Sequence, residues 1–274
     1  MDRVRSLRSF LWPIAAFILI TIGIAWANGH PAKCEGTLPC APTWPGWQPA
    51  SCYPGCFCEA FHAGGIVQPL SSYSNLFYIL AGLLILGTRN LPAQDARNNL
   101  MTRRRGYITG YGWAAVGIGV TSLFFHVSLT HIGRWFDYMG MYAFTGYALV
   151  YSLARFRRWN DRTFIVPFAL LLAALGGLWF AAPDSRRPLL GGLILGLIVV
   201  EAVVHWARRP IRIRTRYFLA SLACFLVAYS INMSDEAGAL CVPESAWQWH
   251  AVWHFLTAAS TVLLYVYYRT EDEG

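Results

Sequence analysis

Eight apolar stretches of about 20 residues each occupy most of this chain, and they restrict it to a membrane fold. They lie near residues 9–28, 67–87, 107–127, 132–153, 163–182, 188–207, 216–233 and 247–268. A helix of about that length crosses a hydrocarbon core of roughly 30 Å, and its backbone polar groups are satisfied within the helix. Charged residues make up 13% of the chain, against about 25% in soluble domains. The sequence therefore predicts an all-α integral membrane protein.

The apolar pattern divides the chain into four parts. Residues 67–268 hold seven of the stretches and predict a seven-transmembrane-helix bundle. Residues 29–66 form a Cys-rich outer loop, and residues 269–274 form an inner tail. Residues 1–28 combine a basic start, an apolar stretch and the string Ala25-Trp26-Ala27, which suits either a cleaved signal peptide or a retained N-terminal anchor helix. The seven-helix body is predicted under both interpretations.

Basic residues indicate which loops face the cytoplasm. With the N-terminus inside, the inner loops are rich in arginine: Arg89, Arg97, Arg103, Arg104, Arg105, Arg155, Arg157, Arg158, Arg162, Arg208, Arg209, Arg212, Arg214 and Arg216. The outer loops hold few basic residues, namely Lys33, Arg134, Arg186 and Arg187. This asymmetry predicts that both termini are cytoplasmic if residues 1–28 are retained. It also accounts for the net charge of +8, so nucleic-acid binding is not expected.

Most cysteines fall on the predicted outer side: Cys34, Cys40, Cys52, Cys56, Cys58 and Cys241. An even number of outer cysteines favours disulfides in an oxidising compartment. The alternative makes Cys52, Cys56 and Cys58 metal ligands. Their C-x3-C-x-C spacing lacks the paired knuckles of a structural zinc site, so disulfides are the favoured interpretation.

Polar side chains inside the apolar stretches gather in a single layer, the outer leaflet. Such groups are costly in a membrane and need a reason. The predicted topology brings the following residues to this layer: Ser71, Ser72, Ser74, Asn75, Ser122, His126, Asp137, Asn232, Ser234, Asp235, His250 and His254. We expect Ser71, Asn75, Asn232 and Asp235 to surround a site formed by the histidines.

The spacing of the histidines predicts a metal site. His250 and His254 are four residues apart and project from one helix face, as do Ser122 and His126. Asp137 follows across a short turn and can face back toward His126. Three imidazoles and a carboxylate are the components of a catalytic zinc site with one position open for water. A single intramembrane histidine also occurs as an interhelical hydrogen bond, and a histidine pair as haem ligands.

Other histidines do not belong to this layer. Glu201 and His205 are also four residues apart but lie toward the inner end of their stretch, which favours a structural pair or an interface anchor. His30, His62 and His131 fall in outer loops and are expected to be solvated.

Together, these strings resemble the alkaline ceramidase family, and within it a bacterial-type member, in the CREST superfamily of seven-helix membrane hydrolases. The resemblance rests on Ser122-Leu-Phe-Phe-His126, on Asp137 within RWFDYMGMY, and on His250-Ala-Val-Trp-His254. Cys58-Glu59, followed by QPLSSYSNL at 68–76, resembles the entry into the first helix of the family. The likeness covers roughly residues 56–268.

The resemblance implies roles for these residues. His126, His250 and His254 would bind Zn2+, Asp137 would act on the zinc-bound water, and Ser122 would donate to the developing oxyanion. The implied activity cleaves the N-acyl amide bond of a ceramide-like membrane lipid to a fatty acid and a sphingoid base. The resemblance also implies a disulfide between Cys58 and Cys241, which leaves Cys34, Cys40, Cys52 and Cys56 for two further bridges.

Two aspects of the resemblance leave alternatives open. Animal members carry an acidic Ca2+ cluster before the first helix; Glu59 fits one position, but Gln68 stands where a carboxylate is expected, which argues against calcium regulation. The motif is specific to the superfamily and not to one substrate. A lipid esterase or acyl-remodelling hydrolase with the same site, and a non-catalytic lipid-sensing receptor, are therefore the alternative functions.

Overall fold

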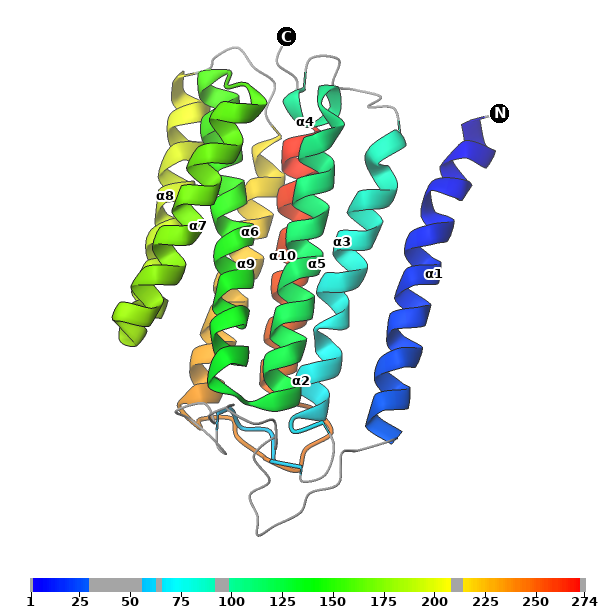
Figure 1. Cartoon of the computed structure of the whole chain (residues 1–274), viewed down its shortest axis with the longest axis vertical. Helices are drawn as coiled ribbons and strands as arrows, with labels where there is room; N and C mark the ends of the chain where they lie inside the picture. The colour runs from blue at the N-terminus through cyan, green and yellow to red at the C-terminus, as the bar shows by residue number, and fades with distance from the viewer. Residues whose placement is uncertain (1, 30–55, 63–65, 92–98, 208–213, 272–274) are drawn as a thin grey trace.

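A computed structural model describes residues 2–29, 56–62, 66–91, 99–207 and 214–271, and Figure 1 shows long helices running side by side. Within these ranges the chain is helical and holds no strand. In chain order the elements are α1 (Asp2–Gly29), α2 (Pro69–Ser74), α3 (Leu76–Gly87), η1 (Thr88–Asn90), α4 (Leu100–Arg103), α5 (Arg105–Ser128), α6 (His131–Arg157), α7 (Asp161–Ala181), η2 (Pro183–Ser185), α8 (Arg186–Ala207), α9 (Thr215–Glu236) and α10 (Trp249–Arg269).

Six helical segments among the described residues are long and apolar enough to cross a membrane. They are Pro69–Asn90, Arg105–Ser128, Asp161–Ala181, Pro183–Ala207, Thr215–Glu236 and Trp249–Arg269. Helix α6 is longer, at 27 residues, but its more polar composition keeps it outside this group. The apolar part of α1, Ser9–Gly23, is shorter than the six. The predicted all-α membrane class is confirmed at this level.

Glycines bring α3 and α5 into close contact. A Cβ added to Gly82 would lie 2.6 Å from the carbonyl oxygen of Gly112, and one on Gly119 would lie 2.8 Å from the carbonyl oxygen of Asn75. Small residues that let backbones approach are a common means of packing helices in membranes, where lipid and side chains are equally apolar. The contact sets the polar segment around Asn75 beside the end of α5 that carries His126.

In the half of the bundle away from His126, the core is rich in tyrosine. Tyr107, Tyr111, Tyr147, Tyr151, Tyr265, Tyr267 and Tyr268 form one buried cluster from α5, α6 and α10. Their rings meet mainly edge to face, a favourable arrangement for aromatic quadrupoles. This end of the molecule is therefore a packed core.

A buried ionic network lies at the same end. Arg155 of α6 contacts Glu201 of α8 at 2.6 Å and also pairs with Glu271 beyond α10. The hydroxyl of Tyr267 donates to Glu201 at 2.6 Å. The expected pair of Glu201 with His205 is wrong, because Glu201 faces the core and pairs with Arg155 whereas His205 lies on the exposed side of α8.

The segment before α2 is attached to the end of the bundle that carries His126, opposite the tyrosine cluster. Cys58 forms a disulfide with Cys241 with a Cα–Cα distance of 5.3 Å, as the family resemblance implied. The backbone N–H of Gln68 donates to the carbonyl oxygen of His126 at 3.2 Å. In Figure 1 this end is the lower one, whereas α1 begins and α10 ends at the upper one. We refer to the lower end as the histidine end.

Candidate metal centre

Three histidines from two helices meet at the histidine end. His126 lies in the last turn of α5, and His250 and His254 lie one turn apart in the first turns of α10. One ring nitrogen from each lies within 4.8 Å of the other two. The Nε2 atoms of His126 and His250 are 3.2 Å apart. All three side chains are buried, with exposed fractions of 1%, 5% and 3%.

The other ring nitrogen of each histidine is held by an oxygen atom. Nδ1 of His126 lies 2.9 Å from the amide oxygen of Gln68, and Nδ1 of His250 lies 2.8 Å from the amide oxygen of Asn232. Amide oxygens only accept hydrogen bonds, so both imidazoles carry their proton on Nδ1. The Nε2 atom of each ring then carries no proton, and the lone pairs of the two atoms face each other.

His254 is fixed in the same way. Its Nδ1 lies 2.7 Å from the hydroxyl of Ser74, and that hydroxyl donates its own proton to the carbonyl oxygen of Ser71 at 2.8 Å. The hydroxyl must therefore accept from Nδ1 of His254. Partners on the outer ring nitrogen that fix tautomer and orientation are typical of metal-ligating histidines.

This donor set fits a small tetrahedral cation. Zn–N bonds of about 2.0–2.1 Å in a tetrahedron separate the ligand nitrogens by about 3.3 Å, close to the 3.2 Å between the Nε2 atoms of His126 and His250. Two lone pairs at that distance repel unless a cation lies between them. A haem would require its ring to separate two axial histidines, and nitrogens this close do not allow it. The geometry therefore favours a single ion over a haem.

Ser122 and Asp137 border the same space. Ser122 comes from α5 and Asp137 from α6, and both face the same cavity. Both residues line a cavity of about 510 Å³ together with His250 and His254. A serine, a carboxylate and two of the histidines, all of them predicted site residues, thus border one space.

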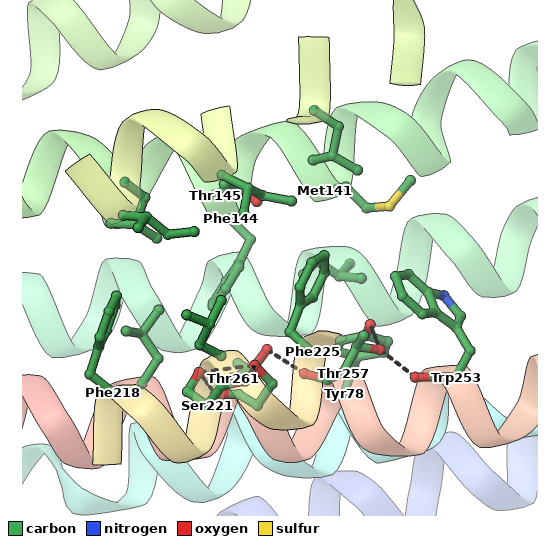
Figure 2. A pocket seen from close by; sticks show the side chains of 18 residues that line it. Tyr78, Met141, Phe144, Thr145, Phe218, Ser221, Phe225, Trp253, Thr257 and Thr261 are labelled. Atoms are coloured by element: carbon green, nitrogen blue, oxygen red, sulfur yellow. Dashed lines mark hydrogen bonds between the residues drawn. The ribbon is translucent and has the colours of Figure 1, made fainter. Parts of the chain in front are cut away.

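A second, apolar cavity adjoins the first and runs toward the tyrosine core. It measures about 110 Å³ and shares with the larger cavity Tyr78, Met141, Phe225 and Trp253, among other residues. Figure 2 shows part of its lining, with Met141, Phe144 and Thr145 of α6 on one side and Ser221, Thr257 and Thr261 of α9 and α10 on the other. On α10 it extends from Trp253 to Leu264, about 16 Å along a helix axis. The metal centre therefore opens onto a narrow apolar space inside the bundle.

The predicted surrounding residues divide into two groups. Asn232 binds His250, and the Ser71 carbonyl oxygen accepts from the Ser74 hydroxyl that holds His254. The other two hold the backbone around the site: the Asn75 amide donates to the Ser71 carbonyl oxygen at 2.8 Å, and Asp235 accepts from the Cys58 N–H at 3.4 Å. Neither Asn75 nor Asp235 contacts a histidine in the described structure.

The residues expected at a calcium position have other uses. Both carboxylate oxygens of Glu59 accept backbone N–H groups at the start of α2, those of Leu70 at 2.6 Å and Ser71 at 2.8 Å. Gln68 uses its amide oxygen to hold His126. A carboxylate that caps a helix and an amide that holds a histidine do not fit a calcium cluster of the implied kind.

Three residues near the histidines were not among the predicted site residues. Gln68 and Ser74 orient His126 and His254, and the Phe57 ring stacks on His250 at a centroid distance of 3.7 Å. Ser74 belongs to the polar layer that the sequence shows. It lies on a different apolar stretch from the three histidines, so no i, i+4 spacing links it to any of them. Nothing in the residue pattern marks Gln68 or Phe57, because both lie in an irregular segment whose position depends on tertiary contacts.

The remaining predictions concern the cysteines and the histidines outside the cluster. Cys56 is disulfide-bonded, as is Cys58, which favours disulfides over a cysteine metal site. Cys34, Cys40, Cys52 and His30 lie outside the described residues. His62 is exposed as expected. His131 begins α6 and does not lie in a loop; it is half-buried, with the Trp179 ring at a centroid distance of 5.0 Å.

The chain matches no protein-family model and no curated protein sequence. The family resemblance therefore remains an expectation that rests on the motifs themselves.

Proposed function

We propose that this chain is a zinc-dependent intramembrane hydrolase that cleaves the N-acyl amide bond of ceramide-like lipids to a fatty acid and a sphingoid base. One observation supports the proposal: three histidines converge, and two of them, His250 and His254, line a cavity together with Ser122 and Asp137 that adjoins an apolar one. The apolar cavity suits an acyl chain, and the larger cavity suits the amide and the head group.

The chemistry follows from the residues present. Zinc held by His126, His250 and His254 would act as a Lewis acid and make a water molecule acidic near neutral pH. Asp137 accepts a proton from the attacking water as its oxygen bonds to the amide carbon. The same proton then goes to the amine nitrogen as the C–N bond breaks. The products are a carboxylic acid and an amine, and the acid then releases its proton to water.

Ser122 has a role that changes during the reaction. In the resting site we expect its hydroxyl to donate to the carboxylate of Asp137, which lines the same cavity, and so to orient it. Once Asp137 holds a proton of its own, the Ser122 hydroxyl is free to donate to the oxyanion that develops on the amide oxygen. Ser122 therefore acts first as a positioning residue and then as an oxyanion donor.

The proposal includes a membrane topology. Helix α6 is counted as the seventh span because its polar residues Arg134 and Asp137 face the cavity that it lines. Polar residues that face a bundle interior are compatible with a transmembrane helix. Helix α1 is an additional helix outside the seven. In this proposal the arginine distribution favours cytoplasmic termini, if residues 1–28 are retained, and a metal centre in the outer leaflet.

Hydrolysis by the purified, zinc-loaded protein tests this function. The protein is incubated with a long-chain ceramide, another N-acyl lipid and a phosphatidylcholine, and the released fatty acid and amine are quantified by mass spectrometry. We expect release from the amide lipids, and its loss in His250→Ala. Release only from phosphatidylcholine would make the chain a lipid esterase. Stoichiometric zinc without cleavage of any lipid would favour a lipid-sensing receptor.

A further inference from the structure

Two polar side chains lie at the junction where the larger cavity meets the apolar one. Tyr78 of α3 and Trp253 of α10 line both cavities. Among the described residues that line both, these two alone carry an O–H or N–H group, because the others are apolar. Polar groups beside an apolar space are costly unless they are hydrogen-bonded. The hydrogen bonds of this pair therefore indicate what the junction can bind.

The hydroxyl proton of Tyr78 already has a partner. The hydroxyl donates to that of Thr257, and Thr257 gives its own proton to the Trp253 carbonyl oxygen at 2.6 Å. Figure 2 shows these three residues together toward one end of the apolar cavity. Thr257 has no second proton to give, so the direction of the Tyr78 bond is fixed. The Tyr78 oxygen, in a side chain with an exposed fraction of 5%, therefore offers the junction an acceptor and no proton.

The indole of Trp253 offers the opposite chemistry. Its N–H group can only donate, and it has no acceptor within the part of the chain that the structure describes. The ring packs against Phe225 and Tyr229 of α9, at centroid distances of 5.9 and 6.5 Å. The junction thus combines one oxygen that accepts with one nitrogen that donates. A hydroxyl group can do both at once, whereas a methylene group can do neither.

The depth of the junction places such a hydroxyl on the acyl chain. Thr257, which binds Tyr78, lies three residues past His254 on α10, in the direction in which the apolar cavity extends. Three residues advance a helix by about 4.5 Å, which is also the length of about three C–C bonds. A lipid with its amide carbonyl at the histidines and its acyl chain in the apolar cavity therefore brings its first few chain carbons to the junction.

We propose that Tyr78 and Trp253 form a hydroxyl-binding subsite, and that the preferred substrate is an amide lipid with a hydroxyl on the second or third carbon of its acyl chain. This inference rests on the proposed hydrolase function and specifies its substrate class. The substrate hydroxyl donates to the Tyr78 oxygen and accepts from the Trp253 N–H. An unsubstituted chain leaves that N–H beside methylene groups, and a buried donor without a partner is unfavourable.

Matched acyl chains test the subsite. The zinc-loaded protein in detergent is given three amides of hexadecylamine, which has no hydroxyl of its own: the tetradecanoyl, 2-hydroxytetradecanoyl and 3-hydroxytetradecanoyl amides. We expect the wild type to favour one hydroxyacyl amide over the plain amide by roughly 3–10-fold in kcat/KM, the effect of one or two neutral hydrogen bonds. Tyr78→Phe and Trp253→Phe keep an aromatic ring and should each remove most of this preference. Tyr73→Phe should retain it, because Tyr73 of α2 lines neither cavity.

Comparing two substrates in one variant separates recognition from stability, because a general loss of folding or of zinc lowers both rates alike. Equal kcat/KM for all three amides, or a preference that survives both Tyr78→Phe and Trp253→Phe, would overturn the subsite and leave the hydrolase proposal intact. A fourth lipid, N-tetradecanoylsphinganine, carries its hydroxyls on the amine side. A preference for this lipid alone would also overturn recognition on the acyl side.

Binding decides the subsite if no lipid is cleaved, in which case the hydrolase proposal fails. One hydroxyacyl amide should then raise the Tm of the wild type more than the plain amide does, and Tyr78→Phe should abolish the difference. Equal Tm shifts for all three amides in the wild type would contradict the subsite.

Discussion

The Nε2 atoms of His126 and His250 lie 3.2 Å apart, although 124 positions separate the two residues in the chain. Gln68 and Asn232 hold the Nδ1 protons of both rings, so two lone pairs face each other. Such a contact is repulsive unless a cation lies between the nitrogens. Together with His254, whose ring nitrogen lies within 4.8 Å of the other two, these histidines could hold a metal ion.

Removal of one ligand should empty the metal centre. We expect His126→Ala and His250→Ala to lower the zinc content from about one ion per chain to below about one tenth, because a three-nitrogen site loses most of its affinity with one donor. Plasma mass spectrometry of protein purified without chelator measures this. His62→Ala is the matched control, since His62 is an exposed histidine at the same end. Full zinc content in either ligand variant would contradict the assignment.

Asn232, which orients His250, should affect the affinity for zinc but not the number of zinc ions bound per chain. Asn232 accepts from Nδ1 of His250, and loss of such a partner typically weakens metal binding about 10–100-fold. Asn232→Ala should therefore bind zinc more weakly by that factor in competition with a chelator of known affinity. Ser234→Ala serves as the control on the same helix, because its hydroxyl bonds back to the Ser230 carbonyl oxygen. An Asn232→Ala affinity equal to that of the control would remove the orienting role.

Asp137 should be needed for turnover and not for zinc binding. Asp137→Asn keeps the size of the side chain but removes the proton acceptor, and we expect kcat to fall by about 10²–10⁴-fold. The zinc content should stay at the wild-type value, as Asp137 is not among the clustered ligands. Asp184→Asn, an exposed carboxylate at the same end, is the control. Wild-type hydrolysis by Asp137→Asn would exclude it as the base.

The disulfide should stabilise the segment that covers the metal centre. Cys58 and Cys241 are 183 residues apart, and cross-links of this kind contribute about 2–4 kcal/mol to the free energy of unfolding. The double variant Cys58→Ser/Cys241→Ser should melt at a lower temperature. It should also lose the stacking of Phe57 on His250, which a fluorescence label near Phe57 would report. Cys224→Ser, which removes a free cysteine, should melt like the wild type; equal Tm values for all three proteins would show that the bridge contributes nothing.

The buried ionic network should control stability independently of the site. Glu201→Gln leaves Arg155 short of one buried partner, and breaking such a pair costs about 3–5 kcal/mol of unfolding free energy. Asp161→Asn breaks the exposed pair with Arg104, which should cost less than about 1 kcal/mol. Chemical denaturation in detergent compares the two. Zinc content should be unchanged in both variants, because the network lies at the end opposite the histidines.

Much of this protein follows from the sequence alone. Uninterrupted apolar length forces the all-helical membrane class, since lipid offers no partner for backbone groups. The i, i+4 spacing of His250 and His254 places both on one helix face without any knowledge of the fold. The depth of His126 and Asp137 in their stretches was enough to predict that they share one layer with that pair. Periodicity and polarity are properties of residues close together in the chain, so they are visible without knowledge of the fold.

Other features depend on contacts between distant segments. Gln68 reaches His126 because its backbone N–H binds the end of α5, and Phe57 reaches His250 because a disulfide and the Cys58–Asp235 contact hold the loop there. Glu201 pairs with Arg155 and not with His205, because α6 and α8 direct the Arg155 guanidinium and the Glu201 carboxylate into the same core. Helix packing likewise brings Tyr78 and Trp253 to the junction of the two cavities. Spacing along a chain says which residues share a face, whereas only the tertiary structure decides what that face meets.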